Sequence, residues 1–167
     1  GRTPAPRPED QPKRDLASKV VILTGGASAI GLATSKLPGS FGARVFMTDI
    51  NEAGLNEPAA QIGPNVTPIQ HDVTQEADWA RVFKAVETQC GQLDVLVNNA
   101  GIMVPEPFET SSIETVRRQF AINVASVWFG MHGALPLVLR THAQRGTTPS
   151  IANLASIFGK VAGAERS

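Results

Sequence analysis

The sequence contains no tyrosine and only one cysteine, Cys90, among its 167 residues. A single cysteine excludes an internal disulfide framework and fits a reducing compartment, so the sequence predicts a cytoplasmic protein. Net charge is also absent, because 15 Lys and Arg balance 15 Asp and Glu. This balance argues against a nucleic acid as partner, since proteins that bind such a polyanion usually carry a basic excess.

Long hydrophobic runs are missing too. No apolar run reaches about 18 residues, which predicts that no segment spans a membrane. The N-terminus lacks the apolar segment of a secretory signal. The histidines show no metal-ligand spacing with the cysteine, so we expect no metal site. Residues 1–15 are rich in proline and poor in apolar side chains, and they predict a flexible tail before a single domain over residues 16–167.

From Leu16 onward, strand and helix patterns alternate. The strand patterns are nearly continuous runs of Val, Ile and Leu, which are typical of parallel strands buried on both faces. This alternation predicts an α/β fold, a Rossmann-like doubly wound parallel sheet of about five strands with helices on both faces. The expected strands cover 19–24, 44–49, 66–70, 93–98 and 150–155, and the expected helices cover 29–37, 51–62, 74–90 and 112–141.

Two of the expected helices contain a proline. Pro38 should end or kink the first helix near Leu37, because a proline inside a helix loses a backbone hydrogen bond and clashes with the preceding turn. Pro58 raises the same question for the second helix, namely whether it ends or kinks at the proline.

A glycine-rich turn, Thr24–Gly31, joins the first strand to its helix. In a dinucleotide-binding unit such glycines let the backbone approach a pyrophosphate, and the helix N-terminus offers free N–H groups. Many strand-to-helix turns contain glycine, so a purely structural role stays open for the turn alone.

Asp49 strengthens the nucleotide interpretation, because it ends the second strand about 20 residues beyond the turn. An acid at this place can bind a ribose hydroxyl and would repel a 2′-phosphate, which favours NAD over NADP. A solvated aspartate at a strand end is the alternative.

The glycine-rich turn and Asp49 are followed by further motifs, and the order and spacing of the whole set resemble those of the short-chain dehydrogenase/reductase family from Leu16 onward. Those motifs are Asp72-Val73 after the third strand, Asn98–Gly101 after the fourth, Asn123 in the long helix and Ser156 after the fifth strand. The resemblance implies a site for NAD formed by Gly25, Ser28, Ala29, Ile30, Gly31, Asp49, Ile50, Asp72, Val73, Asn99, Ala100 and Gly101.

The resemblance also implies an activity, the transfer of hydride between a secondary alcohol or ketone and a nicotinamide cofactor. Ser156 would orient the substrate oxygen, and Asn123 would position a water in a proton relay. A strand-end serine is otherwise a turn former, and Asn123 could be a satisfied core asparagine. Within the family the likeness is to hydroxysteroid and cyclic-alcohol dehydrogenases. Members commonly form dimers or tetramers through two long central helices, so the full-length form is expected to be a homo-oligomer.

Two departures from the family pattern bear on function. Ala29 stands where the family usually has the second glycine of its turn, and we expect weaker binding of NAD for that reason. The family's reaction also needs a Tyr-x-x-x-Lys motif, which would begin just after Ser167. We therefore expect a chain that is truncated at its C-terminus and inactive by itself.

Two other functions stay open at this point. The first is a non-catalytic nucleotide-binding protein or fragment that lacks the Tyr-x-x-x-Lys motif. The second is another Rossmann-type protein, such as a methyltransferase that uses S-adenosylmethionine, although Asn98–Gly101 and Ser156 count against it.

Overall fold

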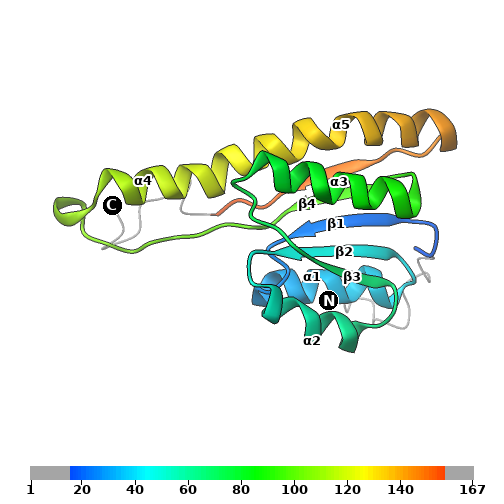
Figure 1. The fold of residues 1–167 in the computed structure, drawn as a ribbon, viewed down its shortest axis with the longest axis horizontal. Coiled ribbons are helices and arrows are strands. Elements are labelled where there is room, and N and C mark those ends of the chain that lie inside the picture. The colour runs from blue at the N-terminus through cyan, green and yellow to red at the C-terminus, as the bar shows by residue number, and fades with distance from the viewer. Residues whose placement is uncertain (1–15, 157–167) are drawn as a thin grey trace, which may run out of the picture.

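The computed structural model describes residues 16–156, so the expected tail at residues 1–15 lies outside the described residues, as do residues 157–167. Five strands form one sheet in the order β3-β2-β1-β4-β5 (Figure 1), and all four strand pairs are parallel. This confirms the predicted doubly wound α/β architecture. The strands are β1 (Val20–Thr24), β2 (Arg44–Asp49), β3 (Val66–Gln70), β4 (Val95–Asn98) and β5 (Ser150–Asn153).

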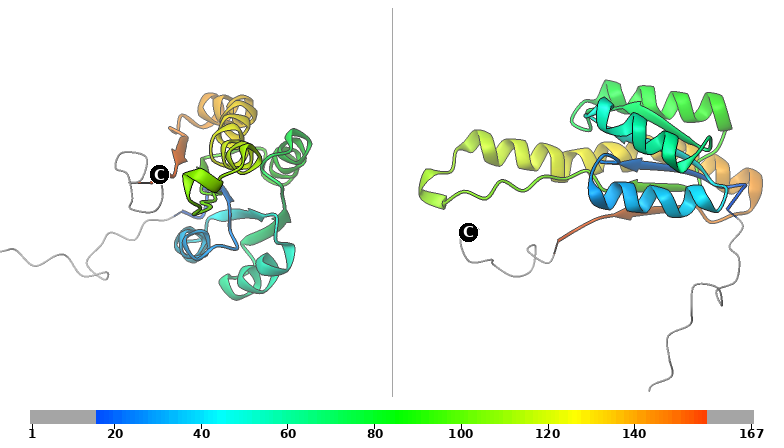
Figure 2. Two further views of the ribbon diagram at one scale, coloured as in Figure 1. Left: turned by 90° about the vertical axis from the view of Figure 1, so that its left-hand side faces the viewer. Right: turned by 90° about the horizontal axis from the view of Figure 1, so that it is seen from below.

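Helices cover both faces of the sheet. In Figures 1 and 2, α1 and α2 lie on one face, and α3 and α5 lie on the other. The helices are α1 (Ala29–Ser40), α2 (Glu52–Ile62), α3 (Glu76–Cys90), α4 (Ile113–Phe120) and α5 (Ser126–Arg145), with a short 3-10 turn, η2 (Phe108–Thr110), and a π-helical turn, η3 (Ala121–Ala125).

Two apolar clusters fill the spaces between the sheet and its helices. Successive side chains of β1 point to opposite faces, so Val21 and Leu23 join the cluster under α2 while Ile22 joins the cluster under α3 and α5. Every residue of β1 is buried, which explains why this central strand is a continuous apolar run.

Of the two outcomes expected at Pro38, an end of the first helix near Leu37 is wrong, because α1 continues through Pro38 to Ser40, and the kink stays a prediction. Pro38 lies in the last turn, where its missing N–H removes a single intrahelical bond. Its carbonyl still accepts hydrogen bonds from the backbone N–H groups of Phe41 (3.2 Å) and Ala43 (3.0 Å).

The second proline is tolerated in the same way. α2 runs across Pro58 to Ile62, and Leu55 and Ala59 on either side of the proline are buried against the sheet. Packing of the apolar face therefore holds both halves of this helix in place.

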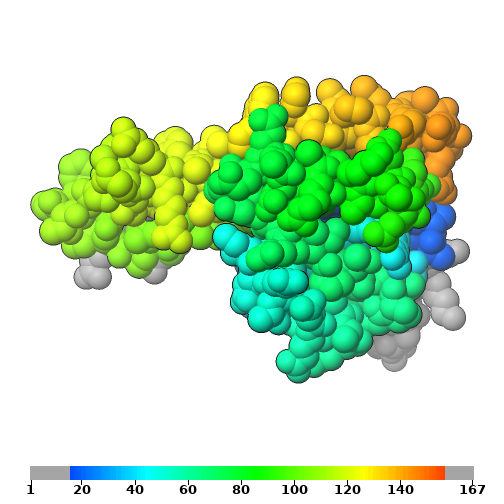
Figure 3. Space-filling view, in the orientation of Figure 1, coloured from blue at the N-terminus to red at the C-terminus, as the bar shows by residue number. Residues whose placement is uncertain are grey.

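The long helix expected over 112–141 is interrupted by a π-helical turn. At η3 the N–H of Ser126 bonds to the carbonyl of Ala121, five residues back, and the buried Ser126 hydroxyl bonds to the carbonyl of Ile122. The loop after β4 and helix α4 extend beyond the sheet and form a separate lobe on the left of Figure 3.

The helical stretch Ile113–Arg145 is long and apolar enough to cross a membrane by length and composition alone, with only 22% of its most apolar part buried. No unbroken apolar run marks this stretch in the sequence, because Asn123, His132 and other polar residues interrupt it. One face of α5 packs on α3 and β4, as in a core helix. An exposed apolar stripe runs along α4, η3 and α5, and the expected association through this helical stretch stays a prediction. The stripe consists of Ile113, Val116, Phe120, Val124, Trp128, Met131, Leu135 and Leu139.

Candidate functional site

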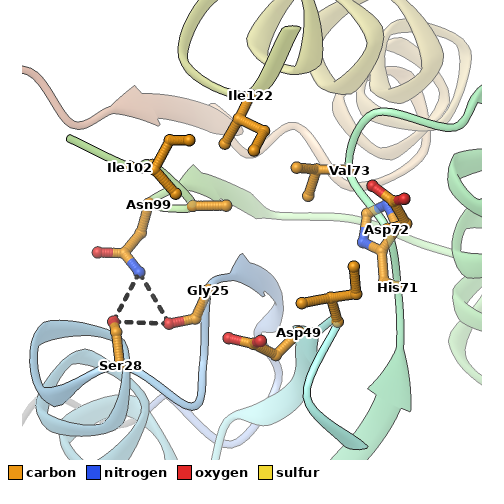
Figure 4. Close-up of a pocket in the computed structure, with 12 residues that line it drawn as sticks. Gly25, Ser28, Asp49, His71, Asp72, Val73, Asn99, Ile102 and Ile122 are labelled. Carbon is orange, nitrogen blue, oxygen red and sulfur yellow. Dashed lines mark hydrogen bonds between the residues drawn. The ribbon is translucent and has the colours of Figure 1, made fainter. Parts of the chain in front are cut away.

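A pocket of about 180 Å³ opens at the carboxyl ends of β1 to β4 (Figure 4). It lies where the strand order reverses between β1 and β4, which is where open α/β sheets bind ligands. Most of the predicted cofactor residues line it, namely Gly25, Ser28, Asp49, Ile50, Asp72, Val73, Asn99, Ala100 and Gly101. His71, Ile102 and Ile122 also line it, and the sequence reasoning missed these three.

The glycine-rich turn is shaped by steric necessity at two positions. Gly25 has a φ of 69°, and a Cβ at this position would lie 2.8 Å from Asn99 Nδ2. A Cβ on Gly31 would lie 2.0 Å from the carbonyl oxygen of Gly25. Both contacts are too short for any side chain, so the turn keeps this shape only with glycine there.

Ser28 caps the helix that follows the turn. Its hydroxyl accepts the N–H of Gly31 (3.0 Å) and donates to the carbonyl of Gly25 (2.8 Å). In the part of the chain that the structure describes, the N–H groups of Ala29 and Ile30 meet no acceptor. Ala29, Ile30 and Gly31 are not part of the pocket lining, but they begin α1 beside it. Free N–H groups at a helix N-terminus suit a pyrophosphate.

Thr24 and Asn99 tie this turn to the loop after β4. The Asn99 side-chain amide donates to the carbonyls of Thr24 (2.8 Å) and Gly25 (3.1 Å), as Figure 4 shows for Gly25. In return, the Thr24 hydroxyl accepts the backbone N–H groups of Asn99 (3.1 Å) and Ala100 (3.0 Å). Thr24 is almost fully buried. Its polar side chain at the end of an apolar strand was the signal that could have marked it.

Asp49 holds its carboxylate at the pocket edge through backbone donors. Oδ2 accepts the N–H of Ala27 (3.0 Å), and Oδ1 accepts the N–H of Asn51 (2.9 Å). A carboxylate oxygen can accept more than one hydrogen bond, so both remain able to accept a hydroxyl group. The side chain is therefore preorganised and still has capacity for a ligand.

Asp72 and Val73 lie at the other end of the pocket from Gly25 and Ser28 (Figure 4). Asp72 Oδ1 accepts the N–H and the hydroxyl of Thr74, at 2.9 and 2.8 Å. Asp72 Oδ2 accepts no hydrogen bond within residues 16–156, so this oxygen is available to a donor on a ligand.

Asn98, which precedes the pocket residue Asn99, links β4 to β5. Its side-chain Nδ2 donates to Oδ1 of Asn153, which is its direct partner in the strand register, at 2.8 Å. Asn98 Oδ1 points at α5, where a Cβ on Gly130 would lie 2.6 Å away. Asn153 precedes Ser156 by three residues, so this pair fixes the strand that leads to the serine.

The two candidate catalytic residues lie outside the pocket lining. Asn123 is exposed in η3, so the alternative of a core asparagine is wrong. Its side-chain amide forms two hydrogen bonds with the backbone of Ile102: Nδ2 donates to the carbonyl (2.8 Å), and Oδ1 accepts a hydrogen bond from the N–H (2.9 Å). Ser156 is exposed and follows β5.

His71 is a buried histidine in the lining of the pocket. Its Nδ1 is 2.9 Å from the Thr48 hydroxyl, and its ring meets Trp79 edge-on at a centroid distance of 4.4 Å. No group in the described range bonds to its Nε2. Burial lowers the pKa of His71 from 6.5 to about 4, and the nearby carboxylate of Asp78 opposes that shift only in part.

Comparison with known proteins gives a consistent picture. The family model described as short chain dehydrogenase matches residues 19–167. Over 142 residues the chain is 42% identical to the 3-beta-hydroxysteroid dehydrogenase of Comamonas testosteroni, and the match covers 85% of this chain and 54% of that protein. It is 36% identical over 146 residues to the cyclopentanol dehydrogenase of the same organism, covering 86% of this chain and 56% of the relative.

A solved structure shares the fold. The 3-ketoacyl-(acyl-carrier-protein) reductase from Brucella melitensis, complexed with NADH, superposes with a TM-score of 0.79 at 30% identity. The match covers 84% of this chain and 57% of that chain. The present chain thus spans a little over half the length of the proteins it matches.

The buried His71 predicts loss of stability in mild acid. In the unfolded chain His71 takes up a proton near pH 6.5, whereas in the folded chain its pKa is about 4. The contribution of neutral His71 to folding stability is therefore fully present above pH 6.5 and is lost as the pH falls toward 4. The free energy of unfolding should decrease by about 3 kcal/mol across this window. Urea titrations at several pH values measure it. His71→Asn, which cannot titrate, should flatten the pH dependence by this amount, and an unchanged slope would contradict the prediction.

Proposed function

The chain belongs to the short-chain dehydrogenase family, and we propose that it forms the cofactor-binding half of an NAD-dependent oxidoreductase that acts on secondary alcohols or ketones. The observation that carries the proposal is the shared pocket, in which Gly25, Asp49, Asp72 and Asn99 from four strand ends meet. The cofactor supplies the hydride chemistry when it is bound. The protein's part is to bind it, orient it and manage a proton.

The chemistry of the pocket fits each part of a dinucleotide. Ala29 and Ile30 would bind the pyrophosphate with their free N–H groups, and the Asp49 carboxylate would accept the hydroxyls of the adenosine ribose. Asp72 and Val73 would hold the adenine. Asn99, Ala100 and Gly101, on the other side of the pocket, would hold the nicotinamide half.

The substrate we infer is a cyclic secondary alcohol or the matching ketone. Support comes from the names of two relatives, a hydroxysteroid dehydrogenase and a cyclopentanol dehydrogenase. Ser156 would donate a hydrogen bond to the substrate oxygen. Asn123 would serve the proton relay, because its amide atoms keep further hydrogen-bonding capacity after binding Ile102.

A second candidate is nucleotide binding without turnover. It is favoured by one observation, the absence of tyrosine from all 167 residues. The family resemblance assigns the acid–base step toward the substrate oxygen to a tyrosine, so these residues by themselves would hold the cofactor without completing the reaction.

The carboxylate of Asp49 predicts a preference for NADH over NADPH. A fixed negative charge at the ribose repels a 2′-phosphate, so the dissociation constant for NADPH should be at least about tenfold higher. Asp49→Ser should narrow that ratio toward one, and fluorescence titration of the reduced nucleotides measures both values. Glu52→Ser, which removes an acid one residue after the helix cap of α2, is the matched control and should leave the ratio alone. Failure of the unaltered chain to bind NADH would refute the proposed function.

Ala29 predicts a weakened pyrophosphate site. Ala29→Gly removes the methyl group at the first residue of α1 and should lower the dissociation constant for NADH by roughly three- to tenfold. Ala33→Gly makes the same change one turn further along the exposed side of α1 and should bring no gain. Equal affinities for the original chain and Ala29→Gly would show that the methyl group does not crowd the phosphates.

The missing tyrosine predicts the absence of turnover. With cyclopentanol or a 3-hydroxysteroid and NAD, the 167-residue chain should produce no reduced nicotinamide above a blank without protein. Nicotinamide absorbance follows the reaction, and NADH titration of the same sample shows that the protein is competent to bind. Sustained turnover by this chain would overturn the assignment of the proton step to a tyrosine.

A further inference from the structure

Two side chains of helix α3 bind the backbone of the loop at the end of the pocket proposed for adenine. The backbone N–H of Asp72 donates to Oδ2 of Asp78 at 2.8 Å, and the indole N–H of Trp79 donates to the carbonyl of Val73 at 2.9 Å. Two consecutive residues of the helix thus bind two consecutive residues of the loop. Neither Asp78 nor Trp79 lines the pocket, so both act from outside it.

Trp79 gives this pair a rigid base. Its side chain is 2% exposed, stacks on Phe83 at 5.6 Å and meets the edge of His71 at 4.4 Å. A Cβ on Gly130 of α5 would lie 2.7 Å from its ring, so the indole fits closely between two helices. The indole N–H therefore points at the Val73 carbonyl with little freedom to turn away.

Asp78 supplies a charged acceptor. The hydrogen bond from the Asp72 N–H, assisted by Arg81, holds the pKa of Asp78 below its usual value, so the carboxylate is ionised at neutral pH. Its other oxygen forms an ion pair with Arg81 at 3.1 Å. A hydrogen bond to an ionised acceptor is stronger than a neutral one, which favours a single position for the loop.

After the hydrogen bonds to α3 and Thr74 are formed, Asp72 and Val73 keep one free acceptor and one free donor for a ligand in the pocket. The Asp72 N–H and the Val73 carbonyl are taken by α3, and Asp72 Oδ1 is taken by Thr74. The Val73 N–H and Asp72 Oδ2 bond to nothing in residues 16–156. An acceptor next to a donor complements the adenine edge, whose amino group donates and whose neighbouring ring nitrogen accepts.

We propose that Asp78 and Trp79 are positioning residues for adenine, which set the acceptor of Asp72 and the donor of Val73 at the spacing that the adenine edge requires. This inference rests on the proposed function, because it concerns the same cofactor. It adds that specificity for the base depends on two side chains of α3 that do not touch the cofactor.

The test compares NADH with its deamino analogue, which carries hypoxanthine in place of adenine. Hypoxanthine has a carbonyl where adenine has an amino group and a protonated ring nitrogen beside it, so its pattern opposes that of Asp72 and Val73. The unaltered chain should bind NADH at least about tenfold more tightly than the analogue. Asp78→Ala and Trp79→Phe should each reduce this preference to less than about threefold.

Two controls separate positioning from general stability. Glu76→Ala removes an exposed acid from the same first turn of α3, and Val86→Ala removes buried volume from the same helix. Both should keep the preference of the unaltered chain, even if Val86→Ala unfolds more easily. Asp78→Asn, which keeps one acceptor oxygen, should restore part of the preference that Asp78→Ala loses.

The outcomes distinguish this inference from the proposed function. If the unaltered chain binds no NADH, the proposed function fails, and the positioning role fails with it. If it binds NADH and the analogue equally, cofactor binding stands while the positioning role is overturned. If Asp78→Ala and Trp79→Phe weaken both nucleotides by the same factor, the two side chains are only structural and the inference is wrong.

Discussion

The buried hydroxyl of Thr24 and the amide of Asn99 form the interaction on which the site depends. Each of the two residues binds the backbone of the other's loop, so the turn after β1 and the loop after β4 cannot move separately. Their position follows from topology, because β4 pairs directly with β1 and the chain reverses its direction across the sheet there. A parallel sheet brings the two strand ends together, and these hydrogen bonds convert that proximity into a fixed geometry.

The same linkage extends across the sheet to β5. Asn98, next to Asn99, binds Asn153 in the neighbouring strand, and the carbonyl of Asn98 also accepts the N–H of Leu154. Close approach of α5 over this pair is possible because residue 130 is glycine, since a Cβ there would meet Asn98 Oδ1 at 2.6 Å. The glycine-rich turn and the strand that leads to Ser156 are therefore parts of one hydrogen-bonded unit.

The sequence predicted best where local pattern and tertiary structure agree. The buried strands appear as apolar runs, and the polar residues at their ends meet in one pocket because strand ends of a parallel sheet share an edge. The helix end expected at Pro38 is wrong because this proline lies in the last turn of α1, where its missing N–H removes a single bond. The second helix is found over the expected residues, because the tertiary packing of Leu55 and Ala59 outweighs the local cost of Pro58.

Other features left no signal that spacing alone could reveal. At the π-helical turn that contains Asn123, the backbone N–H of Ser126 bonds to the carbonyl of Ala121, five residues back, and no residue type in the sequence marks this change of spacing. The sequence shows only that His71 lacks metal-ligand spacing, and the structure shows that its ring contacts Thr48 and Trp79. The role of His71 depends on partners on other elements of the fold, and a single sequence does not identify those partners.

The two ends of the pocket are built in different ways, and this bears on how binding and chemistry divide. The end proposed for adenine packs on the apolar core through Trp79, and the backbone of its loop is hydrogen-bonded to side chains of α3. The opposite end passes into Ile102 and the lobe of α4, where Asn123 clasps an exposed loop and no α4 side chain is buried. The proposed adenine recognition therefore rests on contacts present within the described residues. The proposed substrate end is held by a few polar contacts, so we expect cofactor binding to tolerate substitutions better than substrate binding does.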